Sequence, residues 1–239
     1  MEYGVYVQHT FDINMILVCL YVDDIFLTGS CSTEIAKFQK VLMNEFEMTG
    51  LGNMTYFIGM EIFYSYKGII LHQVKYKLEL LKTFELINYK SGITPAETNN
   101  KFDSDVEDID VHATNFKQLV GSLRYLCNTI PDICYAIGMV SRFMNKPKWS
   151  NYQVIVRILR YIKGTMKYGV LFLCGAKTES ELICYSDSDW CRDRVDRRST
   201  SGYIFKYMEG LISWCSKKQS VVALSTCEVE YIAGALTAC

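Results

Sequence analysis

The chain has 239 residues, enough for one large domain or two small ones. Half of its residues are apolar and 13% are aromatic, a composition that excludes an intrinsically disordered chain. The longest mainly apolar stretch, residues 15–22, is too short to span a membrane, and the N-terminus lacks the pattern of a secretory signal. We therefore expect an ordered, soluble intracellular protein with no membrane partner.

The formal net charge is only −1, so binding to nucleic acid would depend on local clusters of Lys and Arg. The ten cysteines form no CxxC pair, and His9, His72 and His112 lie far apart in the sequence. These spacings predict no zinc site. We expect reduced thiols that are mostly small buried side chains.

Residues 13–28 are two apolar runs joined at Asp23 and Asp24. The pattern predicts a strand–turn–strand unit with the acidic pair at its tip. A helix is expected next over residues 33–48, with Ser32 and Thr33 as good N-cap residues.

The following segment, residues 51–73, predicts a second hairpin around Lys67 and Gly68. A helix is expected over residues 74–84. Residues 88–112 then lose all periodicity and contain Pro95, which predicts a linker. Its acidic run consists of Asp103, Asp105, Glu107, Asp108 and Asp110.

Three helical patterns follow, and they should pack as a small helical subdomain. They cover residues 115–128, 132–144 and 151–163. Beyond Gly169 the pattern changes to strands, in the segments VLFL, ELICYSDSD, TSGYIFKYM, LISWCS and SVVAL. A helix then opens near Ser225, with Ser225 and Thr226 as cap candidates, so this part reads as an α+β unit.

The adjacent carboxylates Asp23 and Asp24 repel each other, and a cation would relieve that cost in a dry site. Mg²⁺ takes oxygen ligands, usually one or two carboxylates plus substrate phosphates. Two such ions can activate a 3′-hydroxyl and stabilise a leaving pyrophosphate, which is polymerase chemistry. An isolated Asp-Asp pair is more often a solvated turn, so the interpretation depends on the surrounding sequence.

That surrounding sequence, LVCLYVDDIFLTG, resembles the catalytic hairpin of reverse transcriptases. Four further segments resemble copia-type LTR retrotransposon Pol polyproteins in the same order along the chain. They are EFEMTGLGNMTYFIGMEI, LVGSLRYLCNTIPDICYAIGMVSRFM, RILRYIKGTMKYGVLF and YSDSDWCRDRVDRRSTSGYIF. Ordered motifs over most of a chain are far more specific than any one of them.

The resemblance implies an α+β protein in three parts. Residues 1–90 would be a partial reverse-transcriptase palm with the YVDD hairpin. Residues 91–175 would be the acidic linker and a helical connection subdomain, and residues 176–239 the N-terminal half of an incomplete ribonuclease H-like α/β unit.

In the palm, the resemblance makes Asp23 and Asp24 metal-binding catalytic carboxylates, with Asp23 the better candidate for direct ligation. Tyr21 and Val22 would lie beside the primer terminus. The hairpin over residues 56–62 would correspond to the primer-gripping element, although plain core strands are an equal alternative.

In the ribonuclease H part, the resemblance makes Asp187 and Glu230 the catalytic metal ligands. A strand carboxylate facing a helix carboxylate can hold a Mg²⁺ pair that positions water against the RNA strand of a hybrid. Two alternatives stay open. Asp189 would share the strand face of Asp187, whereas Glu228 lies about 200° from Glu230 around a helix.

The sequence departs from the family pattern at three places. Cys191 stands where alanine usually follows the tryptophan. The chain ends before the later strands and acids of a ribonuclease H, and it begins after the palm strand that carries the first catalytic Asp. We therefore expect neither active site to be complete and the isolated chain to be inactive and poorly able to fold alone.

Two basic groups could contact phosphates. The first contains Arg142, Lys146, Lys148, Arg157, Arg160, Lys163 and Lys167, and the second Arg192, Arg194, Arg197, Arg198, Lys217 and Lys218. The alternative is a solvated helix face plus a charged turn. Asp193 and Asp196 should neutralise part of the second group.

The parent activity implied by the resemblance is RNA-directed DNA polymerisation with cleavage of RNA in RNA–DNA hybrids. It requires Mg²⁺, with Mn²⁺ as the alternative cofactor. The partners would be an RNA template, a DNA primer, the hybrid, deoxynucleoside triphosphates and the remaining polyprotein segments, in cytoplasmic virus-like particles of a plant-like host. The alternative is a catalytically dead remnant that at most binds nucleic acid. A nucleotide cyclase or other two-metal palm enzyme does not explain the later motifs.

Overall fold

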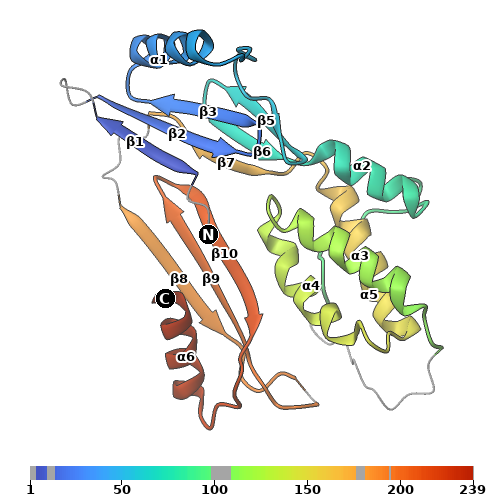
Figure 1. Ribbon diagram of the computed structural model, residues 1–239. Coiled ribbons are helices and arrows are strands. Elements are labelled where there is room, and N and C mark those ends of the chain that lie inside the picture. Colours follow the sequence, from blue (N-terminus) through green and yellow to red (C-terminus); the bar gives the residue numbers. More distant parts are fainter. Residues whose placement is uncertain (1–3, 10–13, 98–108, 176–180, 194, 239) are drawn as a thin grey trace. The chain divides into compact units, whose positions relative to one another are not determined.

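The computed structural model describes residues 4–9, 14–97, 109–175, 181–193 and 195–238 (Figure 1). The chain divides into two compact units, Met1–Met54 and Thr55–Cys239. This division falls inside residues 1–90, which are predicted to form one part. Of the predicted acidic run, only Asp110 lies within the described residues. None of the helices described there is both long and apolar enough to cross a membrane.

The first unit is a three-stranded antiparallel sheet with one helix. The strands β1 (Val5–His9), β2 (Met15–Tyr21) and β3 (Asp24–Gly29) lie in the order β1-β2-β3, and α1 (Ser32–Glu45) packs against β3. The predicted β2–β3 hairpin and the helix are confirmed. The cap prediction is wrong, because the N-cap is Cys31, whose backbone is extended at φ −133° and ψ 116°.

The core of the first unit is small. Within its described residues, Ile16 is the one buried apolar side chain, and α1 buries none. A sheet with so little buried area of its own gains little hydrophobic stabilisation.

Helices form the main core of the second unit. They are α2 (Val74–Thr83), α3 (Ala113–Leu126), α4 (Cys134–Val140) and α5 (Trp149–Gly164). The continuous helix predicted over 132–144 is wrong, because 3₁₀ turns at Pro131–Ile133 and Ser141–Phe143 flank a short α4. The expected helical packing is confirmed, since side chains from all four helices share one buried cluster, including Leu81, Leu123, Ile137 and Ile158.

A four-stranded antiparallel sheet adjoins the helices in the second unit. Its order is β4 (Tyr56–Phe57), β5 (Met60–Ser65), β6 (Gly68–His72) and β7 (Val170–Leu173). The second hairpin is confirmed, although its turn lies at residues 66–67, one residue before the predicted position.

The turn between β4 and β5 requires glycine. Ile58 and Gly59 have φ of 45° and 72°, and the Tyr125 hydroxyl donates to the Ile58 carbonyl. A Cβ added to Gly59 would lie 2.1 Å from the Tyr125 hydroxyl oxygen, so no other residue fits without displacing that ring.

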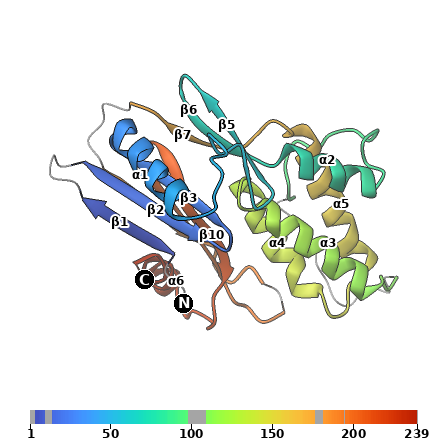
Figure 2. The ribbon, with the colours of Figure 1, turned by 45° about the horizontal axis from the view of Figure 1, so that its top comes forward.

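The last sheet has the order β10-β9-β8, with β8 (Leu182–Ser188), β9 (Thr200–Tyr207) and β10 (Gly210–Lys218), and α6 (Thr226–Ala238) packs against β8 and β9 (Figures 1 and 2). The strand predicted for SVVAL is wrong: residues 220–224 form a loop. The buried Gln219 amide donates to the Ser201 hydroxyl at 2.8 Å and to the Val229 carbonyl at 3.1 Å. These bonds hold the start of the loop against α6 instead of a neighbouring strand.

Lys77 is fully buried among the helices. Its Nζ donates to the carbonyls of Tyr168 at 2.7 Å, Met166 at 3.1 Å and Thr165 at 3.4 Å, all just beyond the end of α5. A cation at this position satisfies carbonyls that the helix itself leaves without donors. Burial lowers the pKa of Lys77 to about 8, although the charges of Asp132 and Glu61 act to raise it.

This pKa predicts a pH dependence of stability. Because the folded pKa of about 8 lies below the ordinary 10.5, the unfolded chain binds more protons between these values. The free energy of unfolding should therefore rise as the pH increases from about 8 toward about 10.5. Urea denaturation over this range should show the rise in the wild type and in Lys82→Met, an exposed change on the same helix, but not in Lys77→Met. An equal rise in Lys77→Met would contradict the assignment.

Candidate functional site

The first candidate site is the tip of the β2–β3 hairpin. Tyr21 and Asp24 face each other across the antiparallel pair and close a two-residue turn of Val22 and Asp23. All four residues are exposed. Val22 has φ of 52° and is 88% exposed, and a β-branched residue in this left-handed region costs of order 1–3 kcal/mol. The structure thus places the predicted acidic pair on a strained, accessible turn.

The ligand chemistry of this tip suits a hard cation. Two adjacent carboxylates match the one or two that Mg²⁺ takes from a protein when substrate phosphates and water complete its shell. Within the described ranges, no group of three or more His, Cys, Asp or Glu residues is arranged to hold a metal ion. The tip therefore fits as a partial ligand set and not as a closed protein cage.

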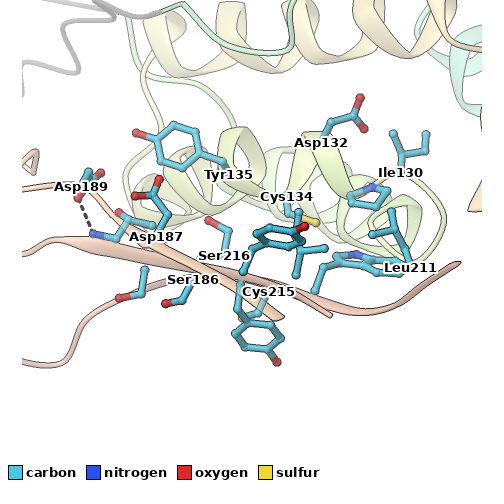
Figure 3. Close-up of a pocket in the computed structure, with 18 of the residues that line it drawn as sticks. Ile130, Asp132, Cys134, Tyr135, Ser186, Asp187, Asp189, Leu211, Cys215 and Ser216 are labelled. Carbon is cyan, nitrogen blue, oxygen red and sulfur yellow. Dashed lines mark hydrogen bonds between the residues drawn. The ribbon is translucent and has the colours of Figure 1, made fainter. Parts of the chain in front are cut away.

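The second candidate site is a cavity of about 790 Å³ between the last sheet and the segment that contains α4. Asp187 of β8 and Asp189, just after it, both line the cavity, and Figure 3 shows their side chains on the side of the sheet that faces α4. Side chains along a strand alternate between its two faces. Ser186, which lies between Tyr185 and Asp187, therefore points to the other side of the sheet. Asp187 and its alternative Asp189 thus share one face, as predicted.

The two acids differ in their surroundings. Asp187 is exposed, whereas Asp189 is partly buried and its Oδ1 accepts a hydrogen bond from the Thr200 backbone N–H at 2.6 Å. Its Oδ2 is buried with no hydrogen-bond partner. Burial raises the pKa of Asp189, although the Thr200 hydrogen bond and the charges of Arg192 and Arg142 oppose the rise.

Glu230 does not line this cavity. It is exposed on α6, whose buried residues Val229 and Ala233 face the sheet. Gln219 connects α6 to Ser188, because its amide donates to both the Val229 carbonyl and the Ser188 hydroxyl. Since Ser188 adjoins Asp187 in a strand, the two point to opposite faces, and α6 therefore packs on the face opposite Asp187.

Glu228 has a role in the helix terminus. Its backbone N–H donates to the Ser225 hydroxyl at 3.1 Å, and its Oε2 accepts from the Leu224 N–H at 2.6 Å. This Ser-x-x-Glu arrangement is a form of capping box. It confirms Ser225 as a cap residue and leaves Glu230 as the α6 acid with no such structural duty.

Most of the first basic group is used within the protein. Arg157 binds Glu97 and the Thr94 carbonyl, while Arg160 and Lys163 donate to the carbonyls of Lys90 and Tyr89. Lys148 pairs with Asp110 at 2.8 Å. These contacts attach residues 89–97 and Asp110 of the predicted linker to α5 and its N-cap residue. They favour the structural interpretation of this group over phosphate binding.

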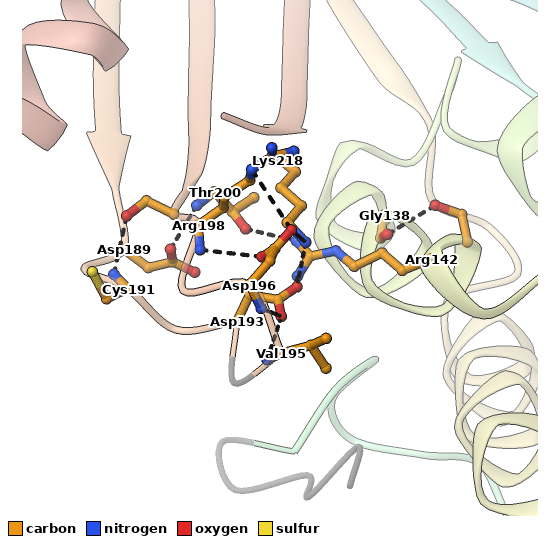
Figure 4. A network of polar contacts seen from close by, with 12 residues as sticks. Gly138, Arg142, Asp189, Cys191, Asp193, Val195, Asp196, Arg198, Thr200 and Lys218 are labelled. Atoms are coloured by element: carbon orange, nitrogen blue, oxygen red, sulfur yellow. Dashed lines mark hydrogen bonds and ion pairs between the residues drawn. The ribbon is translucent and has the colours of Figure 1, made fainter. Parts of the chain in front are cut away.

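Asp193 is the centre of an ion-pair network that joins two parts of the second unit and includes Lys218 of the second basic group (Figure 4). Asp193 Oδ2 lies 2.7 Å from Arg142 Nη1, which comes from the helical part, and 2.6 Å from Lys218 Nζ of β10. Lys218 also pairs with Asp196 at 2.7 Å. The predicted neutralisation by Asp193 and Asp196 is confirmed. Arg194 lies outside the described residues.

Asp193 is held in its charged form. Burial acts to raise the pKa of Asp193, but the hydrogen bond and charge of Lys218 and the backbone N–H groups of Val195 and Asp196 outweigh it and lower the pKa to about 2. The sequence indicated the local charge balance, but it gave no signal for Arg142, which lies far away in the chain.

Replacing Asp193 should destabilise the second unit. Asp193→Asn leaves Arg142 and Lys218 without their shared anion, at a cost of about 1–3 kcal/mol in unfolding free energy. Because the folded pKa lies below the ordinary 3.8, the wild type should lose this contribution as the pH falls from about 4 to about 2. The variant should show no such loss in urea denaturation.

The control is Asp110→Asn, which breaks a pair whose aspartate side chain is 83% exposed and should cost at most about 1 kcal/mol. Equal effects of the two substitutions would show that the Asp193 network does not join the helices to the sheet.

Comparison with known proteins gives the class to which this hairpin belongs. Residues 1–98 match the family model described as reverse transcriptase (RNA-dependent DNA polymerase), and the strained acidic turn lies inside the match. No solved structure matches the chain.

Longer relatives extend the match to almost the whole chain. The uncharacterized mitochondrial protein AtMg00810 of Arabidopsis thaliana is 37% identical over 92% of this chain and 90% of its own length. The retrovirus-related Pol polyprotein from transposon RE1 of the same plant is 37% identical over 91% of this chain. That from transposon TNT 1-94 of Nicotiana tabacum is 35% identical over 98%.

Residues 1–98 belong to the reverse transcriptase family, and the chain is a relative of the retrovirus-related Pol polyproteins of transposons. It spans 15% of the RE1 polyprotein and 18% of the TNT 1-94 polyprotein. The resemblance to transposon reverse transcriptases is thereby confirmed.

Proposed function

We propose that this chain is a segment of a copia-type LTR retrotransposon Pol polyprotein, in which a palm part with the catalytic hairpin is followed by a helical connection and a ribonuclease H-like unit. The observation that carries the proposal is the exposed Asp23–Asp24 pair on a strained hairpin tip inside the family match. In the complete protein the reaction is RNA-directed DNA synthesis on an RNA template from a DNA primer.

In this proposal Asp23 and Asp24 hold Mg²⁺, or Mn²⁺ in its place, which when bound activates the primer 3′-hydroxyl and stabilises the pyrophosphate of the incoming deoxynucleoside triphosphate. The chain itself supplies position. The β2–β3 register from Ile16↔Gly29 to Tyr21↔Asp24 holds the two acids on a regular pair of strands. Tyr21 and Val22, which precede the two acids, would lie beside the primer terminus. The complete protein would act in a cytoplasmic particle that contains the other polyprotein segments.

The proposal also assigns the metal-binding residues of the ribonuclease H-like unit. We take Asp187 as the ribonuclease H metal ligand, with support from its exposed position in an acid-lined cavity next to Asp189. Glu230 remains its proposed partner, since Glu228 is engaged as a cap. In this structure α6 packs on the sheet face opposite Asp187, so Asp187 and Glu230 could share a metal ion only if α6 were placed differently. Asp189 is the alternative second ligand.

The polymerase assignment is tested by primer extension with Mg²⁺ on an RNA template. The 239-residue chain is compared with a longer chain that includes the adjoining coding sequence on both sides, each with and without Asp23→Asn together with Asp24→Asn. The matched control, Glu45→Gln with Glu47→Gln, removes two exposed negative charges from the same unit.

We expect the longer wild-type chain and its control to extend the primer, and the aspartate variant to lose at least about 100-fold in rate because its metal ligands are gone. A folded longer chain with no extension would identify the protein as a remnant whose role rests on binding. Extension that survives the aspartate substitutions would refute the role of the hairpin.

A further inference from the structure

The cavity beside Asp187 has flat aromatic walls. Tyr185 and Trp214 both pair with Ile204 in the register of the sheet, so they share the face on which Asp187 lies. Tyr135 of α4 lies on the opposite wall. The Trp214 Nε1–H is already bonded to the Cys127 carbonyl at 2.8 Å, which fixes the plane of its ring. Such surfaces suit a planar ring that stacks.

One end of the cavity offers acceptors and open space. Asp187 is paired with Gly202, which adds no side chain beside the carboxylate, and Asp189 presents its unpartnered buried Oδ2 close by. The glycine at residue 202 thus leaves room next to the two carboxylates.

The charged residues that line the cavity are mostly acidic, and this charge restricts which planar ligands can bind. Among the described residues that line the cavity, three are acids, Asp132, Asp187 and Asp189, and one is a cation, Arg192. Arg192 lies over the Tyr135 ring at 5.9 Å. Carboxylates accept hydrogen bonds and repel phosphate. The ligand should therefore carry amino donors and no phosphate.

We propose that this cavity binds an unphosphorylated nucleobase or nucleoside with an exocyclic amino group. The ring lies between Tyr135 and the aromatic pair Tyr185 and Trp214, and the amino group donates to Asp187 or Asp189. The cavity volume of about 790 Å³ falls within the 300–1,000 Å³ typical of small-molecule sites. This site goes beyond the proposed polymerase function. It shares Asp187 with the proposed nuclease metal site, so the amino group would bind these carboxylates in the metal-free protein.

The test measures binding of adenosine to the full 239-residue chain by calorimetry and by saturation-transfer NMR, with EDTA present to remove metal ions. Inosine differs from adenosine by a carbonyl in place of the amino group, and it should bind about tenfold more weakly. Adenosine 5′-monophosphate and a short oligoadenylate distinguish a free nucleoside from a base within a strand, and both should also bind more weakly.

The decisive variant is Gly202→Val. Valine favours strands, and an added Cβ at residue 202 would lie 3.5 Å from the Cys215 carbonyl, an ordinary contact. It should leave the fold intact, as checked by thermal unfolding, while filling the space beside Asp187 and weakening adenosine binding at least about tenfold. The matched control, Cys184→Val, lies on β8 three residues from Asp187, and so on the other face, and should bind as the wild type does.

Absence of adenosine binding at millimolar concentration would overturn the proposal. Equal binding of inosine, or unchanged binding in folded Gly202→Val, would overturn it as well. Asp23→Asn with Asp24→Asn should bind adenosine like the wild type. Failure of this site and failure of the polymerase proposal are therefore distinguishable, because the two assays depend on residues in different compact units.

Discussion

Burial of the apolar faces of α2–α5 in one core is the constraint on which the second unit depends. Leu123 and Ile158 are completely inaccessible, and the same burial encloses Lys77. The buried Lys77 side chain donates to the Tyr168 carbonyl, in the segment that connects α5 to β7. β7 then pairs with β6 and returns the chain to a sheet formed much earlier in the sequence. Trp214 and the Asp193 network fasten the last sheet to the same helices.

The elements that local pattern specifies were predicted well from the sequence. The β2–β3 hairpin, the β5–β6 hairpin and α5 follow from apolar periodicity, which needs no knowledge of the rest of the fold. The errors occur where distant contacts decide. SVVAL has the composition of a strand, but the Gln219 side chain holds its start against α6. The broken region around α4 reflects Pro131, which begins a 3₁₀ turn. β1 was not predicted, since its strand character depends on pairing with β2.

The candidate sites show the same difference between features set by local sequence and features set by distant contacts. The position of Asp23 and Asp24 is local, so the sequence could place them on a hairpin tip. Whether Asp187 meets Glu230 depends on which face of the sheet α6 covers, and no periodicity of α6 specifies that face. The cationic groups show a related limit, because Arg142 and Lys218 look like phosphate ligands until Asp193 is found between them. Lys77 did leave a signal, as a charge on the same helical stripe as the buried Leu80 and Leu81.

The most direct test of the central claim, that the Asp23–Asp24 turn is the polymerase centre, is site-specific photocrosslinking. A DNA primer ending in 4-thiothymidine is annealed to an RNA template, bound to the chain in Mg²⁺ and irradiated, and the crosslinked peptide is identified by mass spectrometry. The account predicts a crosslink within residues 21–24. A crosslink confined to other parts of the chain, with none at this turn, would contradict it.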